Sequence, residues 1–245
     1  MKKLYIFSYG LYPEQITLET LAAMRECGEV YSHCLDAGSA RLFRRYAPRL
    51  RLTGRLGLES TAAAAAAALD RCDTVGFLTY GNPLFINQTV PLLAAAAAGK
   101  KAEVRIFSAV SSFDALVALF GLNVFPTAGL RLLDAGTWNA AQEFRPEMST
   151  LVFVVDRLLR PGDEARLEAF AAAARAAYPA GAPAYLADCA SIVSRDAKVI
   201  DGTVGRLASL LRKANERHTL FIPATAEPAR PATGRGARRK RKSRR

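Results

Sequence analysis

Residues 74–83 read TVGFLTYGNP, and this stretch decides the fold of the first half of the chain. Its first seven residues are nearly continuous in apolar character, which is typical of a strand that is buried on both faces of a sheet. The run ends at Gly81-Asn82-Pro83, a combination that marks a turn. We therefore predict a buried strand and a tight turn, and in open parallel sheets ligands bind beside such strand ends.

Strands and helices alternate on both sides of this stretch. We predict strands over residues 4–9, 30–35, 74–80 and 104–107, and helices over residues 17–24, 40–46, 62–71, 87–98 and 113–120. The alternation indicates a mostly parallel sheet with helices on both faces. The alanine-rich helix over residues 62–71 is expected to pack closely on that sheet.

The second half of the chain begins after the turn-rich segment 123–129, which we interpret as a domain junction. Strands are predicted over residues 151–155, 184–188 and 218–222, and helices over residues 163–178 and 203–212. The predicted organisation is therefore an α/β domain over residues 1–122 and a second α/β domain over residues 123–224. Residues 225–245 are a low-complexity mixture without apolar anchors and are expected to form a disordered basic tail.

The positive charge of the chain is concentrated in that tail. The formal net charge is +12, and the nine arginines and lysines from Arg230 onward leave only +3 for the rest. The tail is dense enough to contact phosphate backbones weakly and without base specificity, and a simply solvated end explains it equally well. No apolar run reaches the roughly 18 residues of a membrane span, so we expect no membrane contact and a cytoplasmic protein.

Metal and nucleotide motifs are not found in the sequence. The four cysteines lack CxxC spacing and only two histidines accompany them, so reduced thiols and no metal site are expected. The Rossmann fingerprint and the P-loop are both missing. A second strand end, at residues 108–112 (SAVSS), opens a helix whose free N–H groups suit a carboxylate, although plain N-capping explains it as well.

Four segments together resemble the tetrapyrrole methylase superfamily, whose members bind S-adenosylmethionine in a deep cleft between two α/β domains. They are residues 10–22 (GLYPEQITLETLA), 75–85 (VGFLTYGNPLF), 104–121 (VRIFSAVSSFDALVALFG) and 218–223 (HTLFIP). The family usually carries a Gly-Asp-Pro turn in the second segment and Pro-Gly-x-Ser-Ser in the third. This chain departs from both patterns.

Within the superfamily the chain is most similar to the borosin-type peptide backbone N-methyltransferases. Glu14-Gln15-Ile16-Thr17 matches the end of their first loop, and Tyr80-Gly81-Asn82-Pro83 matches their cofactor turn. This resemblance implies a homodimer that methylates backbone amides of a peptide. Because the tail has no bulky apolar residues of a fused substrate, a separate peptide chain is expected.

The resemblance also implies the roles of individual residues. Cofactor contacts are expected from Tyr80, Gly81, Asn82, Pro83, Phe85, Ser111, Ser112, Val154, Thr219 and Leu220. Val154 replaces a polar residue of the peptide methyltransferases and cannot form a side-chain hydrogen bond. Arg55 and Tyr80 are the candidate catalytic residues. An amide nitrogen must lose its proton, and Leu58 stands where the family has a tyrosine.

Several alternatives remain open at this point. Tyr9, Tyr12, Tyr31 and Tyr46 can substitute for the missing tyrosine or serve as packing aromatics, and His33 can be a general base or a structural residue. A tetrapyrrole or ribosomal RNA methylase of the same fold is the first alternative function, and the basic tail favours RNA. A non-catalytic S-adenosylmethionine-binding homologue is the second, suggested by Leu58 and Val154.

Overall fold

The computed structural model describes residues 1–122 and 128–225, and these divide into two compact units. Unit 1 comprises residues 1–122 together with Cys189–Lys198, and unit 2 comprises the other described residues. The predicted second domain, residues 123–224, thus contains a segment that clusters with unit 1. The expected tail lies outside the described residues, except for Thr225.

Unit 1 is built by alternating strands and helices. In chain order they are β1 (Lys3–Ser8), the 3-10 helix η1 (Pro13–Gln15), α1 (Leu18–Glu26), β2 (Glu29–Ser32), α2 (Ala37–Phe43), β3 (Leu50–Leu52), α3 (Leu58–Ala68), β4 (Thr74–Thr79), α4 (Thr89–Gly99), β5 (Glu103–Ile106) and α5 (Ser112–Phe120). The five strands form one sheet in the order β3-β2-β4-β1-β5, and every neighbouring pair is parallel.

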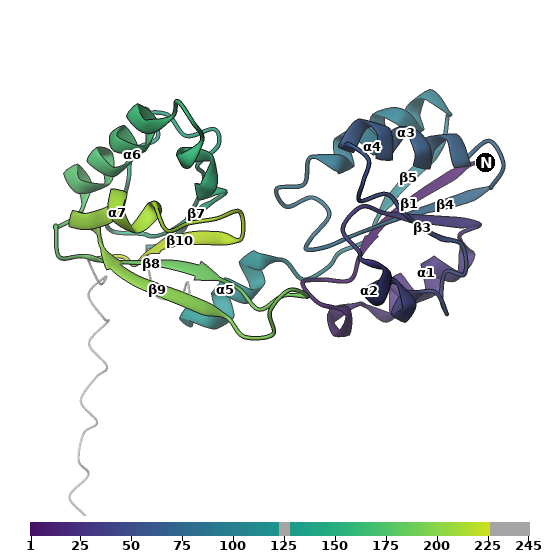
Figure 1. The fold of residues 1–245 in the computed structure, drawn as a ribbon, viewed down its shortest axis with the longest axis horizontal. Helices are drawn as coiled ribbons and strands as arrows, with labels where there is room; N and C mark the ends of the chain where they lie inside the picture. The colour runs from purple at the N-terminus through teal and green to yellow at the C-terminus, as the bar shows by residue number, and fades with distance from the viewer. Residues whose placement is uncertain (123–127, 226–245) are drawn as a thin grey trace, which may run out of the picture. The chain divides into compact units, whose positions relative to one another are not determined.

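The sheet of unit 1 has a core on each face, because successive side chains of a strand point to opposite sides. From β1, Tyr5 and Phe7 pack with buried residues of α1 and α2, whereas Leu4 and Ile6 pack with the alanines of α3 and with α4. Helices α3 and α4 lie on one side of the strands and α1 and α2 on the other (Figure 1). The close packing predicted for the alanine-rich helix is confirmed.

Unit 2 contains a mixed sheet. Its elements are β6 (Leu130–Asp134), β7 (Ser149–Phe153), η2 (Val155–Leu159), α6 (Glu164–Ala177), β8 (Pro183–Asp188), β9 (Lys198–Thr203), η3 (Val204–Arg206), α7 (Leu207–Leu211) and β10 (His218–Ile222). The strand order is β6-β7-β10-β8-β9, with β6 parallel to β7 and β10 antiparallel to both β7 and β8. One buried cluster joins α6 and α7 to β7, β8 and β10.

The predicted two-sheet α/β architecture is confirmed, and most elements lie where the sequence places them. Three strands were missed: β3, β6 and β9. Each contains charged or exposed positions, and each lies at the edge of its sheet, where one side of the strand has no partner. Among the described residues, no helix is long and apolar enough to cross a membrane.

Candidate functional site

The candidate site of unit 1 lies where β1 and β4 end, side by side in the middle of the parallel sheet. The chain after β1 leads to α1, which packs on one face, and the chain after β4 leads to α4, which packs on the other. Figure 1 shows these helices on opposite sides of the strands. Loops that leave neighbouring strands for opposite faces open the crevice in which α/β proteins bind ligands.

Two glycines join these loops. Gly10 and Gly81 form an isolated antiparallel bridge, in which the Gly81 N–H donates to the Gly10 carbonyl at 2.8 Å. Both have positive φ, +77° for Gly10 and +64° for Gly81, which L side chains rarely adopt. A Cβ on Gly10 would lie 2.6 Å from the Gln15 Cβ, so Gly10 is required for packing.

Gly81 differs because the space beside it is open. The residue is buried, yet a Cβ built on it meets no heavy atom within 4 Å beyond its chain neighbours. A ligand can therefore approach the backbone there without displacing protein atoms. This is the close-approach role that the sequence predicts for a glycine in this turn.

The residues of the Glu14–Thr17 match build the loop itself. The Gln15 Oε1 accepts a hydrogen bond from the Leu11 N–H at 2.7 Å, and the Thr17 Oγ1 accepts one from the Thr20 N–H at 3.0 Å at the start of α1. Both side chains thus satisfy local backbone groups. Loop geometry therefore accounts for both residues.

Asn82 also acts within the protein. Its Oδ1 accepts from the Leu84 N–H at 2.9 Å, and its Nδ2 donates to the Ala109 carbonyl at 3.4 Å. The first bond closes a turn of the Asx type. The second ties the loop after β4 to the segment before α5. The Phe85 ring, 6.3 Å from the Phe113 ring, makes a further connection between these segments.

Ser111 caps α5, as one of the two interpretations of this segment expects. Its N–H and its hydroxyl both donate to the Asp114 Oδ2 at 2.7 Å, and the side chain is buried. Asp114 was not singled out from the sequence, although a carboxylate three residues after a serine is a capping signal. The carbonyl of Ser112 accepts a weak bond from the Cys189 thiol at 3.9 Å.

Two further residues that the sequence analysis missed support the strand ends. The Asn87 Nδ2 donates to the Thr79 Oγ1 at 3.1 Å, and its Oδ1 accepts from the Thr89 N–H at 2.9 Å. The Cys34 sulfur accepts a hydrogen bond from the Tyr9 hydroxyl at 3.8 Å, and the Cys34 thiol donates to the Leu78 carbonyl at 3.8 Å. An asparagine two residues before a helix is a detectable capping signal, whereas a single cysteine carries none.

Tyr80 is in an environment that keeps its hydroxyl protonated. Desolvation raises its pKa, and the nearby Cys34 raises it further. Burial is also the main cause of the raised pKa values of Cys34 and Tyr9. These three groups are therefore neutral at physiological pH. Tyr80, which is 54% exposed, can donate a hydrogen bond but is a poor general base.

His33 behaves as a structural residue in this arrangement. Its ring stacks on Phe77 with centroids 5.4 Å apart and planes within 7°. Burial lowers the pKa of the imidazole, so the ring is neutral at physiological pH. Its Nδ1 is buried and has no hydrogen-bond partner among the described residues.

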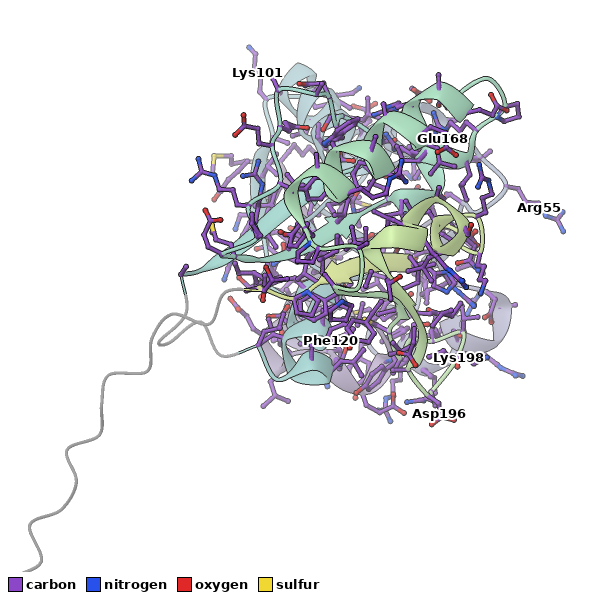
Figure 2. All side chains as sticks on the ribbon, turned by 90° about the vertical axis from the view of Figure 1, so that its left-hand side faces the viewer. Arg55, Lys101, Phe120, Glu168, Asp196 and Lys198 are labelled. Carbon is purple, nitrogen blue, oxygen red and sulfur yellow. The ribbon has the colours of Figure 1, made fainter. Side chains whose placement is uncertain are left out.

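Arg55 lies apart from the bridged loops. It follows β3, which is separated from β4 by β2, and its exposed side chain extends away from the ribbon (Figure 2). In the part of the chain that the structure describes, Arg55 has no side-chain hydrogen bond or ion pair. The structure thus does not join the two catalytic candidates, Arg55 and Tyr80, by any contact.

The four tyrosines that were considered as substitutes all take part in packing or pairing. Tyr9 is buried in the core on the α1 and α2 face, and Tyr12 lies under the Arg195 guanidinium. The Tyr31 hydroxyl donates to Glu29 at 2.6 Å, and the guanidinium groups of Arg25 and Arg45 lie over the Tyr46 ring. These contacts support the packing interpretation of each ring.

In unit 2, the cofactor candidates lie near β7 and β10. Val154 is not on a strand, as the sequence analysis assumed, because β7 ends at Phe153. It adopts the left-handed conformation, with φ +51° and ψ +42°, at the start of η2. Thr219 and Leu220 are adjacent on β10 and point to opposite faces. Leu220 is fully buried in the core, so its side chain is not open to an adenosine contact.

Residues 189–198 form a segment of unit 1 that sequence analysis placed elsewhere. The Ile192 N–H donates to the Leu11 carbonyl at 2.8 Å, and the Arg195 guanidinium forms a two-fold ion pair with Glu14 at 2.7 and 2.9 Å. Arg195 also lies over the Tyr12 ring. We call this the β8–β9 segment. Through these contacts the segment stabilises the loop after β1.

The described residues contain no group of three or more histidine, cysteine, aspartate or glutamate side chains that could hold a metal ion. The turns of the candidate site carry glycine, amide and hydroxyl groups.

The fold is that of an α/β protein with two sheets, and the candidate site lies at the strand ends of unit 1. A family model for the tetrapyrrole (corrin/porphyrin) methylases matches residues 3–208. The chain belongs to this family. A comparison with curated protein sequences gives no match.

Solved structures show the same fold. The uroporphyrin-III C-methyltransferase of Thermus thermophilus, in complex with S-adenosyl homocysteine, is 13% identical with a TM-score of 0.64, and the match covers 90% of this chain and 92% of that one. The methyltransferase CobJ is 15% identical with a TM-score of 0.66, over 92% and 95% of the two chains. Cobalt precorrin-4 methyltransferase, CbiF, is 17% identical with a TM-score of 0.65, over 90% and 94%.

Proposed function

We propose that this protein is an S-adenosylmethionine-dependent methyltransferase whose acceptor is a tetrapyrrole. The observation that carries the proposal is the family match over residues 3–208. Two findings support it. A solved structure of the same fold contains S-adenosyl homocysteine, the product of such a transfer. Two of the neighbouring proteins named above are, by name, methyltransferases of uroporphyrin III and of cobalt precorrin-4.

The residues of unit 1 fit the cofactor. The open space beside Gly81 accommodates a ligand against the backbone, and Tyr80, Asn82, Pro83 and Phe85 form the rest of that turn. In our proposal Ser111 and Ser112 hold polar groups of the cofactor, and Val154, Thr219 and Leu220 are further candidate contacts. When bound, S-adenosylmethionine supplies a methyl group activated by a sulfonium.

The chain contributes positioning more than acid–base chemistry. Tyr80 keeps its proton and can hold an acceptor oxygen by donating a hydrogen bond. Arg55, which has no partner among the described residues, can donate to an anionic oxygen of the acceptor. Alignment of the acceptor atom with the methyl group accounts for much of the catalysis in such a displacement.

Calorimetry of the full-length protein with S-adenosylmethionine and S-adenosyl homocysteine tests the cofactor. We expect both to bind at micromolar concentrations. Absence of binding by either compound contradicts the proposed function at its first step, whatever the acceptor is.

A separate peptide is the second candidate acceptor. The match at residues 80–83 favours it. The match at residues 14–17 does not count toward it, because loop geometry explains that match. Mass spectrometry after incubation with S-adenosylmethionine separates the two candidates. Methylation of a uroporphyrin III or precorrin-4 type compound, and of no peptide, supports the tetrapyrrole. Methylation of a peptide alone overturns it in favour of the peptide.

The expected partners are also proposals. We propose a homodimer, which light scattering of the purified protein tests, and a weak contact of the basic tail with phosphate backbones. Binding of S-adenosyl homocysteine without transfer to any acceptor would support the non-catalytic alternative.

A further inference from the structure

A run of arginines without acidic neighbours lies outside the candidate site. Residues 37–58 contain six arginines and no aspartate, glutamate or lysine. Residues 1–229 together carry only +3, so the remainder of that part of the chain carries −3. The charge of the folded part is therefore concentrated within one short stretch of unit 1.

The structure places these arginines on connected elements at one edge of the sheet. Arg41 lies on α2, and helical hydrogen bonds continue past the helix end, from the Arg44 N–H to the Ala40 carbonyl at 3.1 Å. Arg41, Arg44 and Arg45 therefore share one helix face, because residues three and four apart are neighbours. Arg49 and Arg51 follow directly at β3, the edge strand. All five side chains are exposed.

Few of these side chains have a partner. Within the described residues, Arg51 alone of the five lies within 4 Å of a carboxylate, that of Glu29 at 3.8 Å. Arg45 lies over the Tyr46 ring, 4.7 Å from its centroid. Arg41, Arg44 and Arg49 have neither an ion pair nor a side-chain hydrogen bond there. In contrast, exposed arginines such as Arg105 and Arg212 pair with glutamates at 2.6 and 2.7 Å.

Ordinary structural roles explain only part of this pattern. One cation near the C-terminus of α2 complements the helix dipole, and one charge on β3 protects the sheet edge. Five cations in eleven residues repel one another, and an anionic partner removes that repulsion. Arginine also suits phosphate, because its guanidinium donates two parallel hydrogen bonds.

We propose that Arg41, Arg44, Arg45, Arg49 and Arg51, here named the arginine surface, bind the phosphate backbone of single-stranded nucleic acid. Two guanidinium groups, those of Arg25 and Arg45, lie over the Tyr46 ring, 5.0 and 4.7 Å from its centroid. Contacts to phosphate carry no sequence information, so the surface binds without base preference.

The test measures binding of a fluorescently labelled oligouridine to the full-length protein at several KCl concentrations. The variant Arg41→Gln/Arg44→Gln/Arg49→Gln leaves Arg45 on Tyr46 and Arg51 beside Glu29. The matched control, Arg160→Gln/Arg175→Gln/Arg206→Gln, removes the same charge from exposed positions of unit 2. Both variants retain the basic tail, so its contribution is constant.

We expect the salt dependence of binding to weaken only in the first variant. Loss of three phosphate contacts lowers the slope of log K against log salt by about 2, which equals about 15-fold in affinity between roughly 50 and 200 mM KCl. The Lys triple at the same positions keeps the charge and is expected to retain the wild-type slope. Thermal melting confirms that each variant is folded.

Equal slopes for the first variant and its control would overturn the proposal and leave a solvated surface. Polyglutamate serves as a second probe. If the first variant loses polyglutamate binding while its oligouridine binding is unchanged, the proposal is overturned in favour of an acidic protein partner. Neither measurement involves methyl transfer, so failure of this proposal is distinguishable from failure of the proposed function.

Discussion

The turn after β4 in unit 1 and the turn after β7 in unit 2 use the same backbone conformation in different ways. Gly81 has φ +64° and Val154 has φ +51°. Glycine adopts this conformation without steric cost, whereas a β-branched residue there is a genuine outlier. Such strain persists only where surrounding structure enforces it, and it gathers at ligand sites. The turn after β4 thus provides space beside Gly81, and the turn after β7 holds Val154 in a strained conformation.

Glu29 of unit 1 is buried and Glu168 of unit 2 is exposed, and Glu29→Gln gives the largest expected effect. Glu29 accepts from Arg71 at 2.7 and 3.1 Å and from the Tyr31 hydroxyl at 2.6 Å, which together fix β2 beside β4. Removing the charge of Glu29 leaves Arg71 without its counter-charge and is expected to lower the free energy of unfolding by about 3 kcal/mol. Urea denaturation measures this free energy. Glu168→Gln, which removes an exposed ion pair of unit 2, is the control.

The pH dependence of this effect has a definite sign. The hydrogen bonds from Arg71, and then that from Tyr31, lower the pKa of Glu29 from 4.5 to about 2. A carboxylate with a lowered pKa stabilises the fold above its unfolded-state pKa, and the contribution is lost as the pH falls toward 2. The difference between wild type and Glu29→Gln should therefore shrink from pH 7 to pH 3. An unchanged difference would contradict this role.

Val154→Asn is expected to stabilise unit 2 by about 1 kcal/mol, because asparagine tolerates the left-handed conformation that valine resists. The control Val199→Asn lies on β9, where φ is ordinary, and should be neutral or slightly destabilising. Thermal unfolding compares the two. A destabilised Val154→Asn would mean that contacts of the valine outweigh the strain.

The sequence predicts more of unit 1 than of unit 2, and the reason is physical. Residues 74–83 combine a buried parallel strand with a turn that contains glycine and proline, and both signals are local. The conformation of Val154 follows from neither its type nor its neighbours, since propensity disfavours it. The contacts of residues 189–198 with residues 11–15 join segments far apart in sequence, and no local pattern indicates such pairs.

Arg195→Gln gives the smallest expected change in stability, because exposed ion pairs contribute little. Arg212→Gln in unit 2 is a close control, since both arginines pair with a glutamate at 2.7 Å and are similarly exposed. The two variants should differ in ligand binding. Arg195 supports the loop after β1, so we expect a few-fold weaker S-adenosyl homocysteine binding only there. Equal affinities would show that the β8–β9 segment does not position the loop.

Gly81 is proposed to leave space for the cofactor, and the affinity of the variant Gly81→Ala for S-adenosyl homocysteine tests this role. Gly121→Ala is the control, because Gly121 has φ +58° and open space but lies after α5. Each substitution costs about 1 kcal/mol of stability through its backbone conformation. Calorimetry should show at least about tenfold weaker binding, near 1.4 kcal/mol, for Gly81→Ala and wild-type binding for Gly121→Ala. Equal affinities of the two variants for S-adenosyl homocysteine would contradict this role of Gly81.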